Sequence, residues 1–118
     1  YGRGAVITLP LPDKALWPNG RAHWATKSRA FAKHKAWAFN ATKAVLPRCF
    51  KHNGEPIQLR YTITPKTAHA IDRDNCVAAM MAYQDGIAKA LGIDDSAFAV
   101  PTIEFAAPRK PGGVEVSL

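Results

Sequence analysis

Five of the nine acidic residues in this chain are aspartates that lie between positions 72 and 95. Asp72 and Asp74 are two residues apart, so in an extended segment their side chains lie on one side and can bind one ion together. Asp94 and Asp95 are adjacent in a predicted turn, and Asp85 lies between the two pairs. Carboxylates this close repel one another, and a hard divalent cation such as Mg²⁺ neutralises them. The pattern favours a metal site.

The rest of the chain is strongly basic, and the formal net charge is +7. Basic residues around a metal site would bind a phosphate backbone on which the metal acts. The candidate phosphate contacts are Arg21, Lys27, Arg29, Lys33, Lys35, Lys66 and Arg73. A helix face that is merely solvated is the alternative interpretation of the lysines and arginines between positions 21 and 35.

Each acidic pair also has a purely local explanation. Aspartate is common at helix N-caps and in turns because its carboxylate accepts hydrogen bonds from nearby backbone amides. Asp85 lies eleven residues after Asp74, which is about 16 Å along a helix, so these two cannot share one ion. Composition and spacing therefore leave both explanations open and name no reaction.

Periodicity predicts the elements that position these residues. Predicted strands cover 5–9, 57–63, 99–106 and 113–118, and predicted helices cover 23–45 and 74–91. Prolines end the first two strands, and residues 57–63 alternate between apolar and polar side chains. The first helix is rich in Ala and Lys without Gly or Pro. Asp74 is placed to cap the second helix, and Gly92 is placed to end it.

The two predicted helices each have an apolar face. In the first helix Trp24, Phe31, Ala38 and Ala41 or Thr42 approximate one stripe. In the second helix Cys76, Met80, Tyr83, Ile87 and Leu91 share a face that is expected to pack on the sheet. Trp24 and Trp37 are interpreted as core or dimer-interface residues in preference to base-stacking platforms.

The length of 118 residues fits a single domain over 1–118. The order βαβαββ predicts an α+β fold, a two-layer α/β sandwich in which two helices pack on a mixed or largely antiparallel sheet. Cys49 and Cys76 lack the spacing of a zinc site and are too few for a secreted disulfide scaffold, so a reduced intracellular protein is expected. No apolar run approaches the roughly 20 residues of a membrane span, and no signal peptide is recognisable.

Three segments resemble the signature of the RusA-type crossover (Holliday) junction endodeoxyribonucleases, which phages and prophages commonly encode. They are Asp72-Arg73-Asp74-Asn75, Asp85-Gly86-Ile87 and Leu91-Gly92-Ile93-Asp94-Asp95. The earlier segments Leu9-Pro10-Leu11-Pro12 and Pro18-Asn19-Gly20-Arg21-Ala22-His23-Trp24 resemble the proline-rich entry and basic first helix of that family. The resemblance covers most of the chain, in the same element order.

The resemblance implies a cytoplasmic homodimer, acting in a bacterial host cell, that resolves four-way DNA junctions by paired symmetric nicks in recombination and repair. It implies that Asp72, Asp74 and Asp95 are the catalytic metal-binding acids, that Asp94 is a supporting ligand, and that Mg²⁺ is the cofactor, with Mn²⁺ as a possible substitute. For Asp85 the preferred interpretation is a contact with the basic residues around it or a structural capping role, and not metal binding.

One departure from the family concerns a lysine that usually faces these acids from the second helix. This chain has Ala78 one turn after Asp74 and Met81 two turns after it. Lys89, Lys66 and Arg73 are the candidate replacements. The alternative function is therefore a non-catalytic junction- or DNA-binding protein of the same fold. A nucleotide phosphohydrolase is a third possibility, which the lack of a Gly-rich phosphate loop disfavours.

Overall fold

The structure is a computed structural model, and it describes residues 6–17, 23–45, 54–66 and 73–117. Within these ranges the elements are β1 (Val6–Leu9), the 3₁₀-helix η1 (Lys14–Leu16), α1 (Trp24–Val45), β2 (Arg60–Thr64), α2 (Arg73–Ala79), α3 (Met81–Leu91), the 3₁₀-helix η2 (Asp95–Ala97), β3 (Thr102–Phe105) and β4 (Gly113–Ser117). The predicted strands and the first predicted helix are therefore present with different ends, and the second predicted helix is present as α2 and α3.

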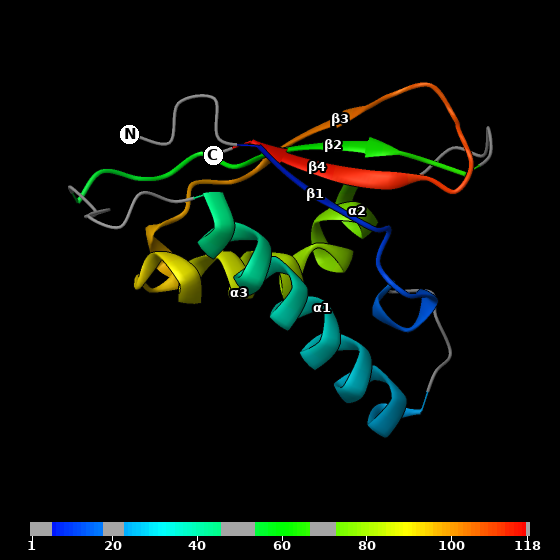
Figure 1. The fold of residues 1–118 in the computed structure, drawn as a ribbon, viewed down its shortest axis with the longest axis horizontal. Helices are drawn as coiled ribbons and strands as arrows, with labels where there is room; N and C mark the ends of the chain where they lie inside the picture. The colour runs from blue at the N-terminus through cyan, green and yellow to red at the C-terminus, as the bar shows by residue number, and fades with distance from the viewer. Residues whose placement is uncertain (1–5, 18–22, 46–53, 67–72, 118) are drawn as a thin grey trace.

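The described strands form one four-stranded sheet in the order β1-β4-β2-β3. Strand β4 is antiparallel to both β1 and β2, whereas β2 and β3 are parallel. The parallel pair arises because α2 and α3 form the crossover between β2 and β3. All three α-helices lie on one face of the sheet (Figure 1). The predicted α+β architecture is confirmed, and its sheet is of the mixed kind.

The core lies between the sheet and the helices. Leu59, Tyr61 and Ile63 alternate along and beside β2 and are fully buried, as the alternation of residues 57–63 predicts. Glu104 and Glu115 are exposed on the opposite face of the sheet. The helical face predicted for the core is confirmed, because Cys76, Met80, Tyr83, Ile87 and Leu91 are all buried in it.

The predicted second helix is divided into two. Met80, with φ −84° and ψ −2°, separates α2 from α3. Its backbone N–H contacts the carbonyl oxygens of both Cys76, at 3.0 Å, and Val77, at 3.2 Å, so the turn tightens toward 3₁₀ geometry. Gly92 ends α3 in the left-handed conformation at φ 71°, as predicted.

The buried stripe of α1 differs from the predicted one at its beginning. The buried residues are Ala30, His34, Ala38 and Thr42, each four positions after the last. Of the two packing alternatives predicted for Trp24, the core is wrong, because 74% of this residue is exposed, and the dimer interface stays a prediction. The first turns of α1, where Trp24 lies, extend away from the sheet (Figure 1).

Candidate nucleic-acid interface

The acidic residues lie at two ends of α3. Asp74 is in the first turn of α2, where the structure describes only its backbone, and Asp72 lies outside the described residues. Asp94 and Asp95 are exposed at the start of η2. In Figure 1, α2 and η2 lie at opposite ends of α3, whose 11 residues span about 16 Å. A single chain therefore does not bring the backbones of Asp74 and Asp95 together.

Asp94 and Asp95 are exposed, and the Asp94 carboxylate has a local hydrogen-bond partner. The Ser96 hydroxyl donates to Asp94 Oδ2 at 2.7 Å, and this hydrogen bond lowers the pKa of Asp94. The side chain of Asp94 does not cap η2, although its backbone carbonyl accepts from Ala97 N–H at 3.0 Å. The Asp94 carboxylate also interacts with the backbone of Asp95 and Ser96, so it has the local hydrogen-bonding role that aspartate commonly has in turns.

The donor chemistry of this pair suits a hard divalent cation, which prefers carboxylate oxygens. Among the residues that the structure describes, however, no group of three or more His, Cys, Asp or Glu side chains is placed to hold a metal ion. Asp85 is half-buried within α3 and joins neither pair. Within the described residues, Asp94 and Asp95 are therefore a pair of neighbouring carboxylates without a third ligand beside them.

Lys27 and Arg29, two of the predicted phosphate contacts, are exposed in the first turns of α1. A shallow groove of about 590 Å³ runs between η1 and this part of α1, and its lining includes Trp24, Lys27, Phe31 and Lys35. An exposed indole between cations is typical of surfaces on which nucleic-acid bases stack. This observation favours the base-stacking interpretation of Trp24 over packing within the chain.

Lys33 has a structural partner that the sequence did not indicate. Its Nζ forms an ion pair with Asp13 Oδ2 at 2.8 Å and lies 5.2 Å from the ring centroid of Trp37. Lys33 therefore connects α1 to the segment before η1, and its charge is largely balanced. Of the other predicted phosphate contacts, Lys66 is exposed after β2, whereas Arg21 and the side chain of Arg73 lie outside the described residues.

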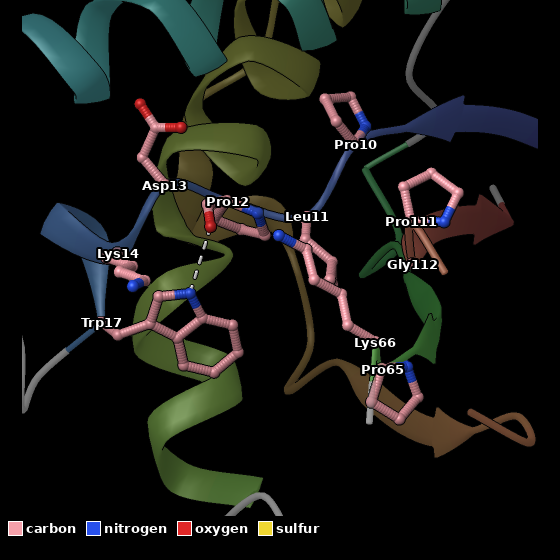
Figure 2. Close-up of a pocket in the computed structure, with 10 residues that line it drawn as sticks. All are labelled: Pro10, Leu11, Pro12, Asp13, Lys14, Trp17, Pro65, Lys66, Pro111 and Gly112. Carbon is pink, nitrogen blue, oxygen red and sulfur yellow. Dashed lines mark hydrogen bonds between the residues drawn. The ribbon is translucent and has the colours of Figure 1, made fainter. Parts of the chain in front are cut away.

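A pocket of about 550 Å³ lies where the β1–η1 segment meets the end of β2 and the β3–β4 connection. Its lining consists of Pro10, Leu11, Pro12, Asp13, Lys14, Trp17, Pro65, Lys66, Pro111 and Gly112 (Figure 2). We call it the Trp17 pocket. Sequence reasoning did not single out Lys14 or Trp17, because the stretch that follows Pro12 has no periodicity. The available signal was an aromatic residue and a lysine beside several prolines.

A buried polar network holds the β1–η1 segment against α1 and α3. Asp13 N–H donates to His34 Nε2 at 3.2 Å, so the ring proton of the neutral imidazole is on Nδ1. Nδ1 lies 2.9 Å from the Tyr83 hydroxyl, and that hydroxyl donates to the Pro10 carbonyl at 2.5 Å. Burial raises the pKa of Tyr83, which keeps the hydroxyl protonated as a donor. This network fixes one wall of the Trp17 pocket.

The fold is expected to lose stability in mild acid because of His34. Burial lowers the pKa of this imidazole below its usual 6.5, and the nearby Asp13 carboxylate opposes the shift less strongly. The unfolded chain therefore binds a proton at His34 before the folded chain does. The stabilisation is complete above about pH 6.5 and is lost as the pH falls through the folded-state pKa.

Urea unfolding measured at pH 8 and pH 5 would test this expectation, with a lower midpoint at pH 5. The His34→Gln variant is expected to lose this pH dependence, whatever its overall stability. The exposed His23 provides the control, since His23→Gln should behave as the wild type does. The pKa of Asp13 is lowered chiefly by its hydrogen bond to Lys33, so this carboxyl titrates below the range compared. An unchanged pH dependence in His34→Gln would contradict the assignment.

Comparison with known proteins gives one named similarity without a function. No protein-family model matches the chain. The chain is similar to an uncharacterized protein of Xylella fastidiosa (strain Temecula1 / ATCC 700964), with 38% identity over 98 residues. The match covers 78% of this chain and 61% of that protein, so the chain spans about three-fifths of the length of its relative. No described helix is both long and apolar enough to span a membrane.

Proposed function

We propose that this protein is a metal-dependent endonuclease of the RusA type that resolves four-way DNA junctions. The observation that carries the proposal is the position of the acidic motif on the fold. Asp74 and Asn75 lie in the first turn of α2, and Asp94 and Asp95 follow α3 at the surface, in the element order that the resemblance implies. The exposed cations of α1 supply a surface for the phosphate backbone. The protein would act in the cytoplasm of a bacterial host and derive from a phage or prophage.

If Asp74 and Asp95 bind the same ion, they must come from different protomers of a homodimer. Asp74 and Asp95 of one chain lie at opposite ends of α3, which is too far apart for both to bind one ion. In a symmetric dimer, the Asp72 and Asp74 end of one protomer can lie beside Asp95 of the partner subunit. Two equivalent sites would result, which matches the two nicks that a four-way junction requires.

Each residue of this site has a distinct role in the proposal. Asp72, Asp74 and the partner's Asp95 would hold the ion, and Asp94 would orient or support them. When bound, Mg²⁺ or Mn²⁺ supplies Lewis-acid polarisation of a phosphoryl oxygen and an activated water. Lys27, Arg29 and Lys66 position the DNA by contacts to phosphates that lie outside the scissile group.

A non-catalytic junction- or DNA-binding protein is the second candidate, and one observation favours it. The positions at which the family usually has a lysine hold the half-buried Ala78 and the exposed Met81. Lys89 is the nearest described cation to η2 along the chain, but its Nζ lies 5.4 Å from the ring centroid of Phe39. This lysine would have to leave that ring in order to replace the missing charge.

Incubation of the purified protein with a synthetic four-way junction and Mg²⁺ or Mn²⁺ tests the proposal. The expected products are paired nicks at symmetric positions, and both ends should be ligatable. A folded dimer that shifts the junction in gel electrophoresis without nicking it in either ion would support the binding protein instead. Hydrolysis of mononucleotides in preference to junction DNA would indicate a phosphohydrolase.

A further inference from the structure

We propose that the Trp17 pocket binds an unpaired nucleobase of the DNA substrate, with Lys14 and Lys66 at the phosphates on either side of that base. The choice of DNA as the source of the base depends on the proposed function. The shape and the charge of the pocket are independent of the nuclease chemistry. The pocket is formed by residues outside the acidic motif and outside the cations of α1.

The walls of the pocket suit a flat aromatic ligand. Trp17 lies on one side, and Pro65 and Pro111 lie on the other (Figure 2). Its volume of about 550 Å³ lies within the usual range for small-molecule sites. Prolyl rings and an indole present apolar faces on which any of the four bases can stack. The pocket therefore favours a base without selecting its sequence.

The indole is held in place before a ligand arrives. Trp17 Nε1 donates to the Pro12 carbonyl at 3.2 Å, and the ring is half-buried against the hydrophobic core. Gly112 has φ +80°, and a Cβ atom there would lie 2.4 Å from Leu11 Cδ1. The close approach of these two wall residues thus depends on glycine. A wall that is already ordered loses little conformational entropy when a base binds.

The charges at the rim favour a ligand with phosphates on both sides of the base. Lys14 and Lys66 are exposed, and both line the pocket. The carboxylate at the rim belongs to Asp13, whose charge is balanced by Lys33 at 2.8 Å. Lys66 also precedes the segment that leads to Asp72 and Asp74 in the sequence.

Binding measured without divalent metal separates this inference from the nuclease activity. We compare the dissociation constants for a four-way junction with unpaired bases at its centre and for a fully paired duplex of equal length. Trp17→Leu is expected to weaken junction binding about tenfold or more, from the loss of one stacked base, with little change for the duplex. Trp17→Phe should restore most of the junction affinity. Equal losses for junction and duplex would overturn the inference.

If Trp17→Leu unfolds, further measurements test whether the Trp17 pocket binds a base of the junction. Lys14→Gln should weaken junction binding, and the matched surface change Lys43→Gln should not. Photocrosslinking of the wild type to a junction with 5-iodouracil at the centre should give an adduct at Trp17, and an adduct at Trp24 instead would contradict the assignment. Equally tight binding of thymidine monophosphate alone would make the pocket a mononucleotide site. A junction that binds through Trp17 but is never cut would leave this inference standing and remove the nuclease.

Discussion

Replacing Asp74 by asparagine is expected to reduce junction cutting by roughly 100-fold or more while junction binding is retained. The amide has the size of the carboxylate but no charge, so it binds Mg²⁺ weakly and does not disturb the surrounding surface. Single-turnover cutting and gel-shift affinity, measured on the same preparation, test both parts. Asp85→Asn is the matched control, because Asp85 lies within α3 and belongs to neither acidic pair. Its cutting rate should stay close to that of the wild type.

A mixture of two inactive variants tests where the site is located. If the metal lies between protomers, a heterodimer of Asp74→Asn and Asp95→Asn has one site with both substitutions and one site with neither. The mixture should therefore regain cutting, with nicks in one strand at a time. If each site belongs to one chain, both sites of the heterodimer stay defective and the mixture remains inactive. A loss of junction binding in Asp74→Asn equal to the loss of cutting would contradict its role as a metal ligand.

Replacing Gly86 by alanine is expected to lower the free energy of unfolding by about 2 to 3 kcal/mol. Gly86 lies in α3 at the closest approach of α1. A Cβ atom there would lie 2.2 Å from the Lys35 carbonyl oxygen, 2.9 Å from Ala38 Cβ and 3.0 Å from Phe39 N. Two of these three atoms belong to the α1 backbone, so the helices must move apart. Urea unfolding at neutral pH gives the change directly.

Gly113→Ala is the control for the Gly86 substitution. The nearest atom to a Cβ on Gly113 is the Leu9 carbonyl oxygen at 3.5 Å, which is an ordinary contact. This change is expected to alter the free energy of unfolding by less than about 1 kcal/mol. Similar losses from both substitutions would show that the helix approach at Gly86 is not the cause.

The elements of the fold followed from local sequence patterns. Strand β2 was predictable because its side chains alternate between core and solvent with a period of two. The buried face of α2 and α3 was predictable from helical periodicity, and the end of α3 from Gly92, whose lack of a Cβ permits φ 71°. The sheet order and the break at Met80 were not predictable in this way, because they depend on contacts between distant segments.

The features of the candidate site can likewise be separated into those that the sequence determines and those that depend on tertiary contacts. The types and the order of the acidic residues, and the basic character of α1, are properties of the sequence. Tertiary structure alone decided that Trp24 is exposed, that Lys33 pairs with Asp13, and that Trp17 lines one pocket with four prolines from separate segments. It also placed α2 and η2 at opposite ends of α3. Periodicity indicates which face of an element is apolar. These features depend instead on where each element ends and on which other elements it contacts there.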